Sequence, residues 1–372
     1  MRRPFAPLAV LAAALLTGAS AAPACASAVS APAAAAPASL AGSASASSSA
    51  LSSAAASASV PASASADEDE GFTIKDPRIV ESSGLAASRQ HPGIYWTHND
   101  QDTGAYLYAV DSATGKTVAT ITLTGVGRPR DVEAISIGPD NQIWVGDIGD
   151  NDGVQWDYVW VYRLPEPARL KDQTIRATQY VVKYQDGSRD AESLVVHPKT
   201  GHVYIIDKHE DGGHLYAGPD RLSTTAPNVF KPVAPIDLWA TDAAFSPDGR
   251  RLVVRGYFGA VAYDWNDGRP RRIGRLDVPL QRQGESVTYT ADGSRLMYGS
   301  EGAESTVVAE DPPGGGAGAD GNSSSGGGSS SGASGASGGG GGGLDDGLTR
   351  GALAVALVCG AVFAVRRLIK RR

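Results

Sequence analysis

Cysteine is almost absent from this chain of 372 residues, which contains only Cys25 and Cys359. Both lie near the ends, in an N-terminal apolar region and in a C-terminal hydrophobic run, so the middle of the chain has none. A disulfide framework and a thiolate metal site are therefore excluded for any domain that folds there. Basic residues are also too few to offset the acids, and the formal net charge is −7. Nucleic acid is accordingly not expected as a partner.

Familiar catalytic motifs are missing from the middle of the chain as well. It has no Gly-x-Ser-x-Gly elbow, no phosphate-binding loop, no dinucleotide fingerprint and no His-Glu-x-x-His pair. These absences remove several common enzyme classes from consideration. They leave open whether the protein is an enzyme of another kind.

The N-terminus has the pattern of an export signal. Arg2 and Arg3 precede an apolar stretch, and small residues follow with an Ala-x-Ala pattern. We expect a signal peptide over residues 1–28. The next segment, 29–70, is nearly all Ala, Ser and Pro with acids at its end, and it has too few apolar side chains to form a core. It is predicted to be a disordered stalk.

The C-terminal part has the composition of a tether followed by a membrane anchor. Residues 312–347 are rich in Gly and Ser and predict a disordered tether. Residues 348–369 predict a transmembrane helix, although its uninterrupted apolar run would span only about 22 Å of a roughly 30 Å hydrocarbon layer and needs its flanking residues. The basic tail, 366–372, is expected in the cytoplasm. We therefore expect a single-pass protein of the cell membrane with its folded region, 71–311, outside the cell.

That folded region contains a repeated pattern of a polar start, a short apolar strand, a turn and a second apolar strand. The repeats begin 44 to 59 residues apart, near Ser83, Glu133, Glu192, Thr241 and Glu285. Two further strands follow most of these pairs, which is the arrangement of a propeller blade. The sequence predicts an all-β fold, a single β-propeller of five four-stranded blades rather than six or seven. The segment 72–80 is expected to close the ring by supplying the last blade with a strand.

Two of the turns carry the resemblance to known families. Phe245 to Leu252 reads FSPDGRRL and Thr290 to Leu296 reads TADGSRL. These segments resemble the turns of WD40, TolB and YVTN-type propellers, and they imply an architecture without a chemistry. The segments WTHND, from Trp96, and GDIGDN, from Gly146, more loosely resemble phytase-like or SMP-30-like secreted propellers.

Polar residues recur at the start of the first strand and at the end of the second, which lie on the same rim of a propeller. We expect an acidic rim made of Glu133, Glu192, Glu285, Asn99, Asp147, Asp207 and Glu301. Oxygen ligands of this kind suit a hard cation such as calcium, and Asp147, Asp207 and Glu301 are the candidate metal ligands. The alternative is structural, because Arg130, Arg189 and Arg282 each precede a rim glutamate by three residues and are placed to form ion pairs.

Two functions fit these features. The first is a binding or scaffolding module displayed at the cell surface, where an extracellular protein, a wall polymer or a small ligand would be its partner. The alternative is a metal-dependent extracellular hydrolase that acts on a phosphoester or a lactone at the acidic rim. We expect the chain to be a monomer in either case.

Overall fold

The computed structural model describes residues 71–100, 104–151 and 154–314. These ranges contain nearly all of the predicted propeller. The predicted signal peptide, stalk, transmembrane helix and basic tail, and most of the predicted tether, lie outside the described residues. Within the described ranges, no helix has both the length and the apolar character needed to cross a membrane.

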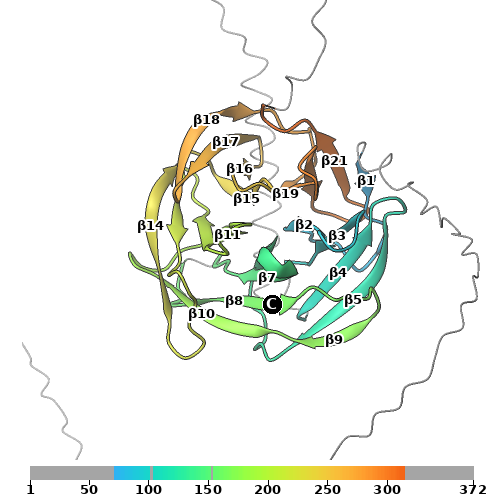
Figure 1. The fold of residues 1–372 in the computed structure, drawn as a ribbon, viewed down its shortest axis with the longest axis horizontal. Helices are drawn as coiled ribbons and strands as arrows, with labels where there is room; N and C mark the ends of the chain where they lie inside the picture. Colours follow the sequence, from blue (N-terminus) through green and yellow to red (C-terminus); the bar gives the residue numbers. More distant parts are fainter. Residues whose placement is uncertain (1–70, 101–103, 152–153, 315–372) are drawn as a thin grey trace, which may run out of the picture. The chain divides into compact units, whose positions relative to one another are not determined.

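The described chain is all β, apart from a short 3-10 turn at Pro139–Asn141. The strands form antiparallel groups around a common axis (Figure 1). In chain order they are β1 (Phe72–Thr73), β2 (Leu85–Ala87), β3 (Ile94–Thr97), β4 (Tyr106–Asp111), β5 (Lys116–Thr124), β6 (Val132–Ile137), β7 (Gln142–Asp147), β8 (Val159–Pro165), β9 (Gln173–Arg176), β10 (Thr178–Tyr184), β11 (Ala191–Val196), β12 (Val203–Asp207), β13 (Gly213–Ala217), β14 (Asn228–Ile236), β15 (Ala240–Phe245), β16 (Arg251–Gly256), β17 (Gly259–Asn266), β18 (Arg269–Leu276), β19 (Gly284–Tyr289), β20 (Leu296–Ser300) and β21 (Thr306–Glu310).

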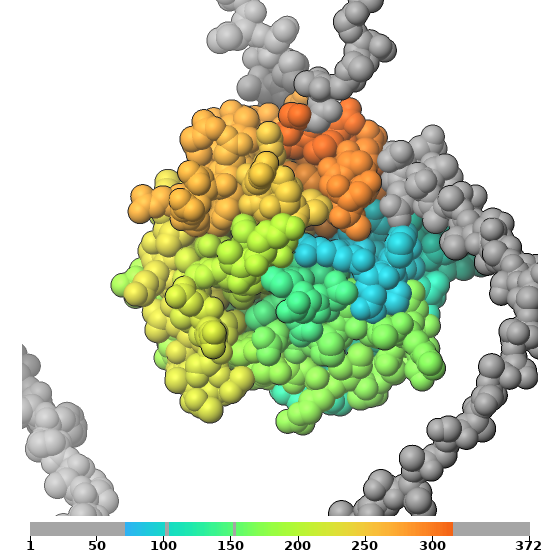
Figure 2. Space-filling view, in the orientation of Figure 1, coloured from blue at the N-terminus to red at the C-terminus, as the bar shows by residue number. Residues whose placement is uncertain are grey.

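The innermost strands close a ring. β2 contacts β6, β6 contacts β11, β11 contacts β15, β15 contacts β19, and β19 returns to β2. From each of these strands a sheet extends outward by antiparallel pairing, as β2–β5, β11–β14 and β15–β18 illustrate. Side chains from these groups meet at the centre of the face seen in the space-filling view (Figure 2). The architecture is that of a β-propeller, as the repeats predicted.

Parallel strand pairs link neighbouring groups at the outer edge. β10 pairs in parallel with β14, so β6, β7, β8 and β10 join β11–β14 in one eight-stranded sheet. β9 leaves its own group and pairs in parallel with β5. These contacts add main-chain hydrogen bonds between neighbouring groups at their outer edges.

The N-terminal strand β1 closes the last group. Phe72 pairs with Val307 and Thr73 with Thr306 in antiparallel register, and the Ile74 amide donates to the Ser305 carbonyl at 2.9 Å. The strand is shorter than the predicted segment 72–80, because the chain turns away after Ile74. The pairing nevertheless gives β21 a partner on its outer side.

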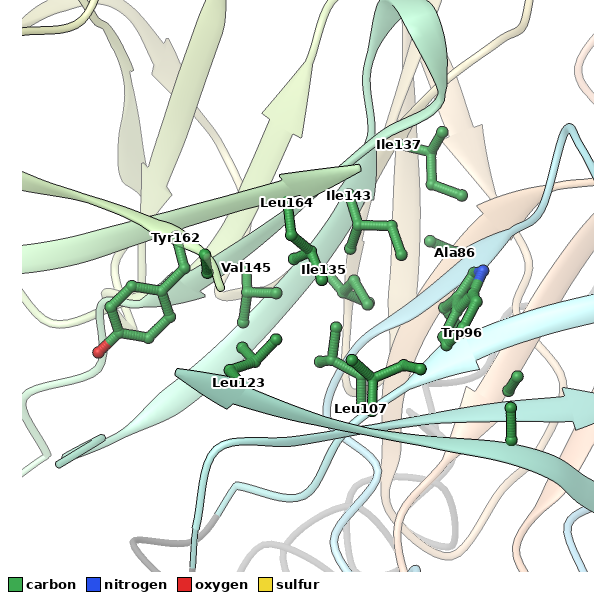
Figure 3. Packing of buried hydrophobic residues seen from close by; sticks show 14 of the residues in the cluster. Ala86, Trp96, Leu107, Leu123, Ile135, Ile137, Ile143, Val145, Tyr162 and Leu164 are labelled. Carbon is green, nitrogen blue, oxygen red and sulfur yellow. The ribbon is translucent and has the colours of Figure 1, made fainter. Parts of the chain in front are cut away.

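The core lies between neighbouring sheets. One cluster is shown in Figure 3, where Trp96 and Leu107 from one group meet Ile135, Ile143 and Leu164 from the next. The alternation of apolar and polar residues along these strands is what brings one face of each sheet into this contact. The two groups are held together by these buried side chains.

Replacing Asp76 with Asn tests how firmly the closing segment is held. Arg78 donates to both carboxylate oxygens of Asp76, at 3.0 and 2.6 Å, and this hydrogen bonding lowers the pKa of Asp76 from 3.8 to about 2. Because the folded-state pKa is depressed, the stabilisation is present above pH 3.8 and is lost as the pH falls toward 2. Arg78 is largely exposed, so we expect the variant to lose only about 1 kcal/mol at pH 7. Urea unfolding at pH 7 and pH 3 measures this, and an equal loss at both values would contradict it.

Candidate functional site: an acidic ring at the propeller axis

The candidate site begins with an irregularity that the inner strands share. The antiparallel register is interrupted at Glu133 in β6, at Glu192 in β11 and at Thr241 in β15, each of which is left out of the pairing. In β19 the interruption spans Glu285 and Ser286. A bulge of this kind turns the extra residue away from the sheet. Four of the five predicted starts of the repeats therefore lie at bulges, and the fifth, Ser83, precedes β2.

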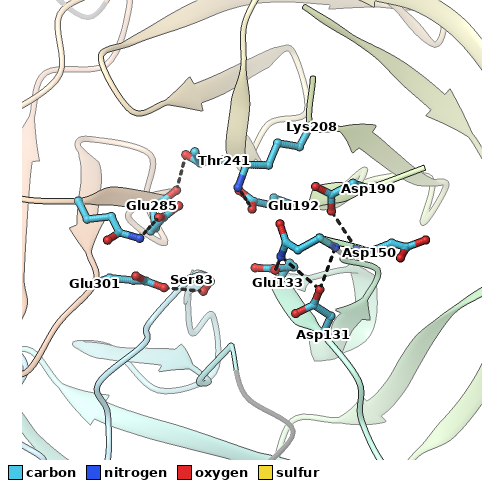
Figure 4. A network of polar contacts seen from close by, with 12 residues as sticks. Ser83, Asp131, Glu133, Asp150, Asp190, Glu192, Lys208, Thr241, Glu285 and Glu301 are labelled. Carbon is cyan, nitrogen blue, oxygen red and sulfur yellow. Dashed lines mark hydrogen bonds and ion pairs between the residues drawn. The ribbon is translucent and has the colours of Figure 1, made fainter. Parts of the chain in front are cut away.

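These bulged residues and Ser83 surround the axis of the propeller (Figure 4). We call them the acidic ring: Ser83, Glu133, Glu192, Thr241 and Glu285. All are buried, with between 1% and 5% of each residue exposed. The Thr241 hydroxyl donates to the Glu285 carbonyl at 2.8 Å, and the side-chain Nε2 of Gln283 donates to the Glu285 carboxylate at 2.8 Å. Three carboxylates of the predicted rim thus share one small region.

Two other predicted rim residues hold the chain that leads into the ring. Asn99 Oδ1 accepts from the amides of Val80 and Glu81, at 3.0 and 3.1 Å. Asp147 Oδ1 accepts in the same way from the amides of Arg130 and Asp131, at 3.1 and 2.9 Å. In each case the two donors lie three and two positions before the ring residue of the same group, which is Ser83 for Asn99 and Glu133 for Asp147. Their oxygens are engaged by main-chain donors, and Asp147 also accepts from the Tyr162 hydroxyl.

Asp207 and Glu301 have different surroundings. Asp207 accepts from the His214 amide and forms an ion pair with Arg189 at 3.5 Å, within its own strand group. Glu301 lies beside the ring, where the Ser83 hydroxyl contacts its carboxylate at 3.5 Å. The candidate metal ligands Asp147, Asp207 and Glu301 each have their own protein partners. A metal bound by these three residues remains a prediction.

A second recurring position faces the ring, and hydrogen bonds identify it. The amides of Asp100, Gly149, Lys208 and Glu301 each donate to the carbonyl two residues before a ring residue, over 2.8 to 3.2 Å. We call these four residues the facing position. Glu301 therefore corresponds to Asp100 and Lys208, and not to Asn99 and Asp207. Counting residues from the end of the second strand had placed it one position out of step.

Asp100, Asp131 and Glu133 form a cluster, and of the three only Glu133 belongs to the predicted rim. One carboxylate oxygen from each lies within 4.8 Å of the others, a spacing that a single cation can bridge. We call these three residues the carboxylate cluster. Asn151 Nδ2 donates to Asp131 at 3.2 Å and to Glu133 at 3.4 Å. Gly149 lies against the cluster, since a Cβ there would be 2.7 Å from Asp131 and 2.8 Å from Glu133.

Electrostatics show that negative charge is concentrated here. Burial raises the pKa of Glu133 well above its ordinary value, and the carboxylates of Asp100, Glu192 and Asp131 raise it further. Burial also raises the pKa of Glu192, against the effect of Lys208. Lys208 contacts Glu192 directly, and the surrounding carboxylates outweigh burial and raise the pKa of this ammonium. The ring therefore favours positive charge.

A cavity among the described residues lies at the end of the inner strands opposite the acidic ring. Its walls include Ala87, Ile137, Val196 and Phe245, and its lining contains no carboxylate. Among the described residues, the group of carboxylates that a cation could bind therefore lies at the acidic ring and not in this cavity. The cavity has no such groups.

Arg130 has a contact that differs from the expected ion pair. Its guanidinium carbon lies 3.9 Å from the ring centroids of both Trp156 and Trp160, and Nη2 donates to the Tyr158 carbonyl at 2.9 Å. The side chain thus stacks between aromatic rings, while its main-chain amide binds Asp147. These tryptophans support the approach to Glu133 by fixing Arg130.

Comparison with solved structures returns matches that include the following three. U3-55K matches with a TM-score of 0.36 and 11% identity, over 64% of this chain and 98% of that one. A gluconolactonase from Xanthomonas campestris matches with a TM-score of 0.40 and 14% identity, over 64% and 78%. The WD40 repeats of RRP9 match with a TM-score of 0.36 and 10% identity, over 65% and 98%. No family model and no curated protein matches the chain.

Proposed function

We propose that this chain is a surface-displayed binding module, a propeller of five four-stranded blades that holds a divalent cation such as calcium at Asp100, Asp131 and Glu133. The observation that carries the proposal is the convergence of three carboxylates within 4.8 Å beside the propeller axis. Hard cations prefer several oxygen ligands and tolerate irregular geometry, which suits side chains from two strand groups. The export signal and C-terminal anchor predicted from the sequence support display outside the membrane.

The surroundings of the carboxylate cluster also support a cation. Glu133 is buried among three other acids, so its ionised form is costly without a positive charge. A bound cation would remove that cost and would leave part of its coordination for oxygens of a ligand. The module would then recognise an oxygen-rich partner, such as a wall polymer or an acidic protein surface, through the cation.

Replacing Asp131 with Asn, or Glu133 with Gln, is expected to weaken binding of calcium roughly 10- to 100-fold or more, because each variant removes one charged oxygen ligand. Titration calorimetry with calcium, and terbium luminescence, measure this on the full chain in detergent. Asp220→Asn is the matched control, since it makes the same charge change at a fully exposed aspartate. Equal affinity of all the variants and the wild type would refute the site.

A hydrolase is the second candidate, and the raised pKa of Glu133 favours it. A carboxyl group whose pKa is raised by burial can serve as a general acid when it is not itself bound to the cation. The cation would polarise a phosphoester or a lactone carbonyl. A screen of both substrate classes with calcium separates the two functions. Turnover that is lost in Glu133→Gln would support the hydrolase, whereas calcium binding without turnover supports the binding module.

A further inference from the structure

The facing position differs in chemistry around the ring. In the group of β6 it is Gly149, which has no side chain and leaves Asp131 and Glu133 without a neighbour from this position. In the group of β11 it is Lys208, whose ammonium reaches the ring glutamate of its own group, Glu192. The ring residues Glu133 and Glu192 therefore differ in this respect. Glu192 is paired with a cationic side chain from the facing position, whereas Glu133 has no side chain opposite it at that position.

The Lys208 ammonium occupies the place of a bound cation. Its side chain is 8% exposed and that of Glu192 is 6% exposed, so neither charge is solvated by bulk water. The carboxylates of two other ring residues, Glu285 and Glu133, also favour the positive charge of Lys208. Glu192 Oε2 is buried and meets no hydrogen-bond partner among the described residues. A carboxylate with one unmatched buried oxygen is a ligand that a divalent metal ion could use more fully, because such an ion can bind both oxygens.

We propose that Lys208 fills a second cation subsite at Glu192 and thereby limits the ring to one divalent cation at the carboxylate cluster. This inference rests on the proposed function for the first subsite, but it makes a separate claim about the second. Lys208 is thus a residue that sets the stoichiometry and the charge of the site. A chain with Gly or Ala at this position would present the open arrangement seen at Gly149.

The test counts the cations bound to the full chain in detergent. Equilibrium dialysis against calcium, followed by elemental analysis, is expected to give one calcium per chain for the wild type and two for Lys208→Ala. The double variant Lys208→Ala with Glu192→Gln is the control, because it also removes the carboxylate that would hold the second ion. It is expected to return to one calcium.

The outcomes separate this inference from the proposed function. One calcium in both the wild type and Lys208→Ala would overturn the second subsite and leave the first intact. None in the wild type and one in Lys208→Ala would support the second subsite and refute the first. None in either protein would overturn both.

A second measurement tests the inference even when Lys208→Ala is less stable because it lacks the ammonium group of Lys208. A cation that binds only the folded state stabilises it. Calcium is therefore expected to raise the Tm of Lys208→Ala more than that of the wild type, and this additional rise should disappear in the double variant. A rise of the same size in all three proteins would overturn the inference.

Discussion

Replacing Arg255 with Met is expected to destabilise the protein by roughly 3–5 kcal/mol, the usual result of removing one member of a buried charged network. Arg255 lies in β16 and is fully buried. Its Nη1 donates to the carbonyls of Ser286 and Gly299, at 2.6 and 2.8 Å, and its Nη2 donates to Gln281 at 2.7 Å. The side chain therefore joins β16 to β19 and β20, and its loss leaves these acceptors unsatisfied.

Loss of the positive charge of Arg255 destabilises the variant further. Burial lowers the pKa of Arg255 to about 10, so the guanidinium still carries its charge at neutral pH. The carboxylates of Glu285 and Asp242 favour that charge, and both would lose it in the variant. Urea unfolding followed by circular dichroism measures the loss. Arg275→Met, at an exposed position of β18, is the control and should change stability by less than about 0.5 kcal/mol. A loss below 1 kcal/mol in Arg255→Met would show that the network contributes little.

Acid should destabilise the wild type more than a His98→Leu variant. Burial lowers the pKa of His98 from 6.5 to about 4, and Nε2 lies so close to the residue before β2 that a Cβ at Gly84 would be 2.6 Å from it. Below pH 6.5 the unfolded chain binds a proton that the folded chain refuses, so stability is lost as the pH falls from 6.5 to 4. Between pH 7.5 and pH 4.5 this amounts to about 2.5 kcal/mol.

The measurement is the difference between the two proteins at each pH, because other acids titrate equally in both. Urea unfolding at pH 7.5, 5.5 and 4.5 should show the wild type falling progressively below His98→Leu. His214→Leu removes an exposed imidazole from β13 and controls for the loss of a histidine as such. Parallel stability curves for the wild type and His98→Leu would mean that His98 titrates alike in the folded and unfolded chains.

The repeats were sufficient to predict the propeller because each one contains its own turn and apolar alternation. The turn at 245–252 forms as expected, with the Ser246 hydroxyl donating to Asp248 at 2.6 Å and the Gly249 amide donating to the Ser246 carbonyl at 2.8 Å. The parallel contacts of β9 with β5 and of β10 with β14 were not predicted. They join residues about fifty positions apart, and nothing in the local pattern of either strand specifies its neighbour.

The site was predicted in part for a similar reason. Glu133, Glu192 and Glu285 were found because they start repeats. Asp100 and Lys208 were not singled out as ligands or cations, because both follow their strands at a position set by a main-chain hydrogen bond. A bulge adds one residue to a strand, and a count of residues along the sequence cannot include it. The register of the carbonyl acceptors, rather than the sequence spacing, aligns Glu301 with Asp100.

The pairing of β1 with β21 determines how the propeller would respond to tension. Phe72 lies opposite Val307 and Thr73 opposite Thr306, so the described chain enters and leaves at the same end of this antiparallel pair. A load applied between the two flanking segments would break these hydrogen bonds one after another, as in unzipping, instead of shearing them together. The load would not travel around the ring. Under force, the seam between β1 and β21 would open first, while the sheets joined by β9 and β10 stayed intact.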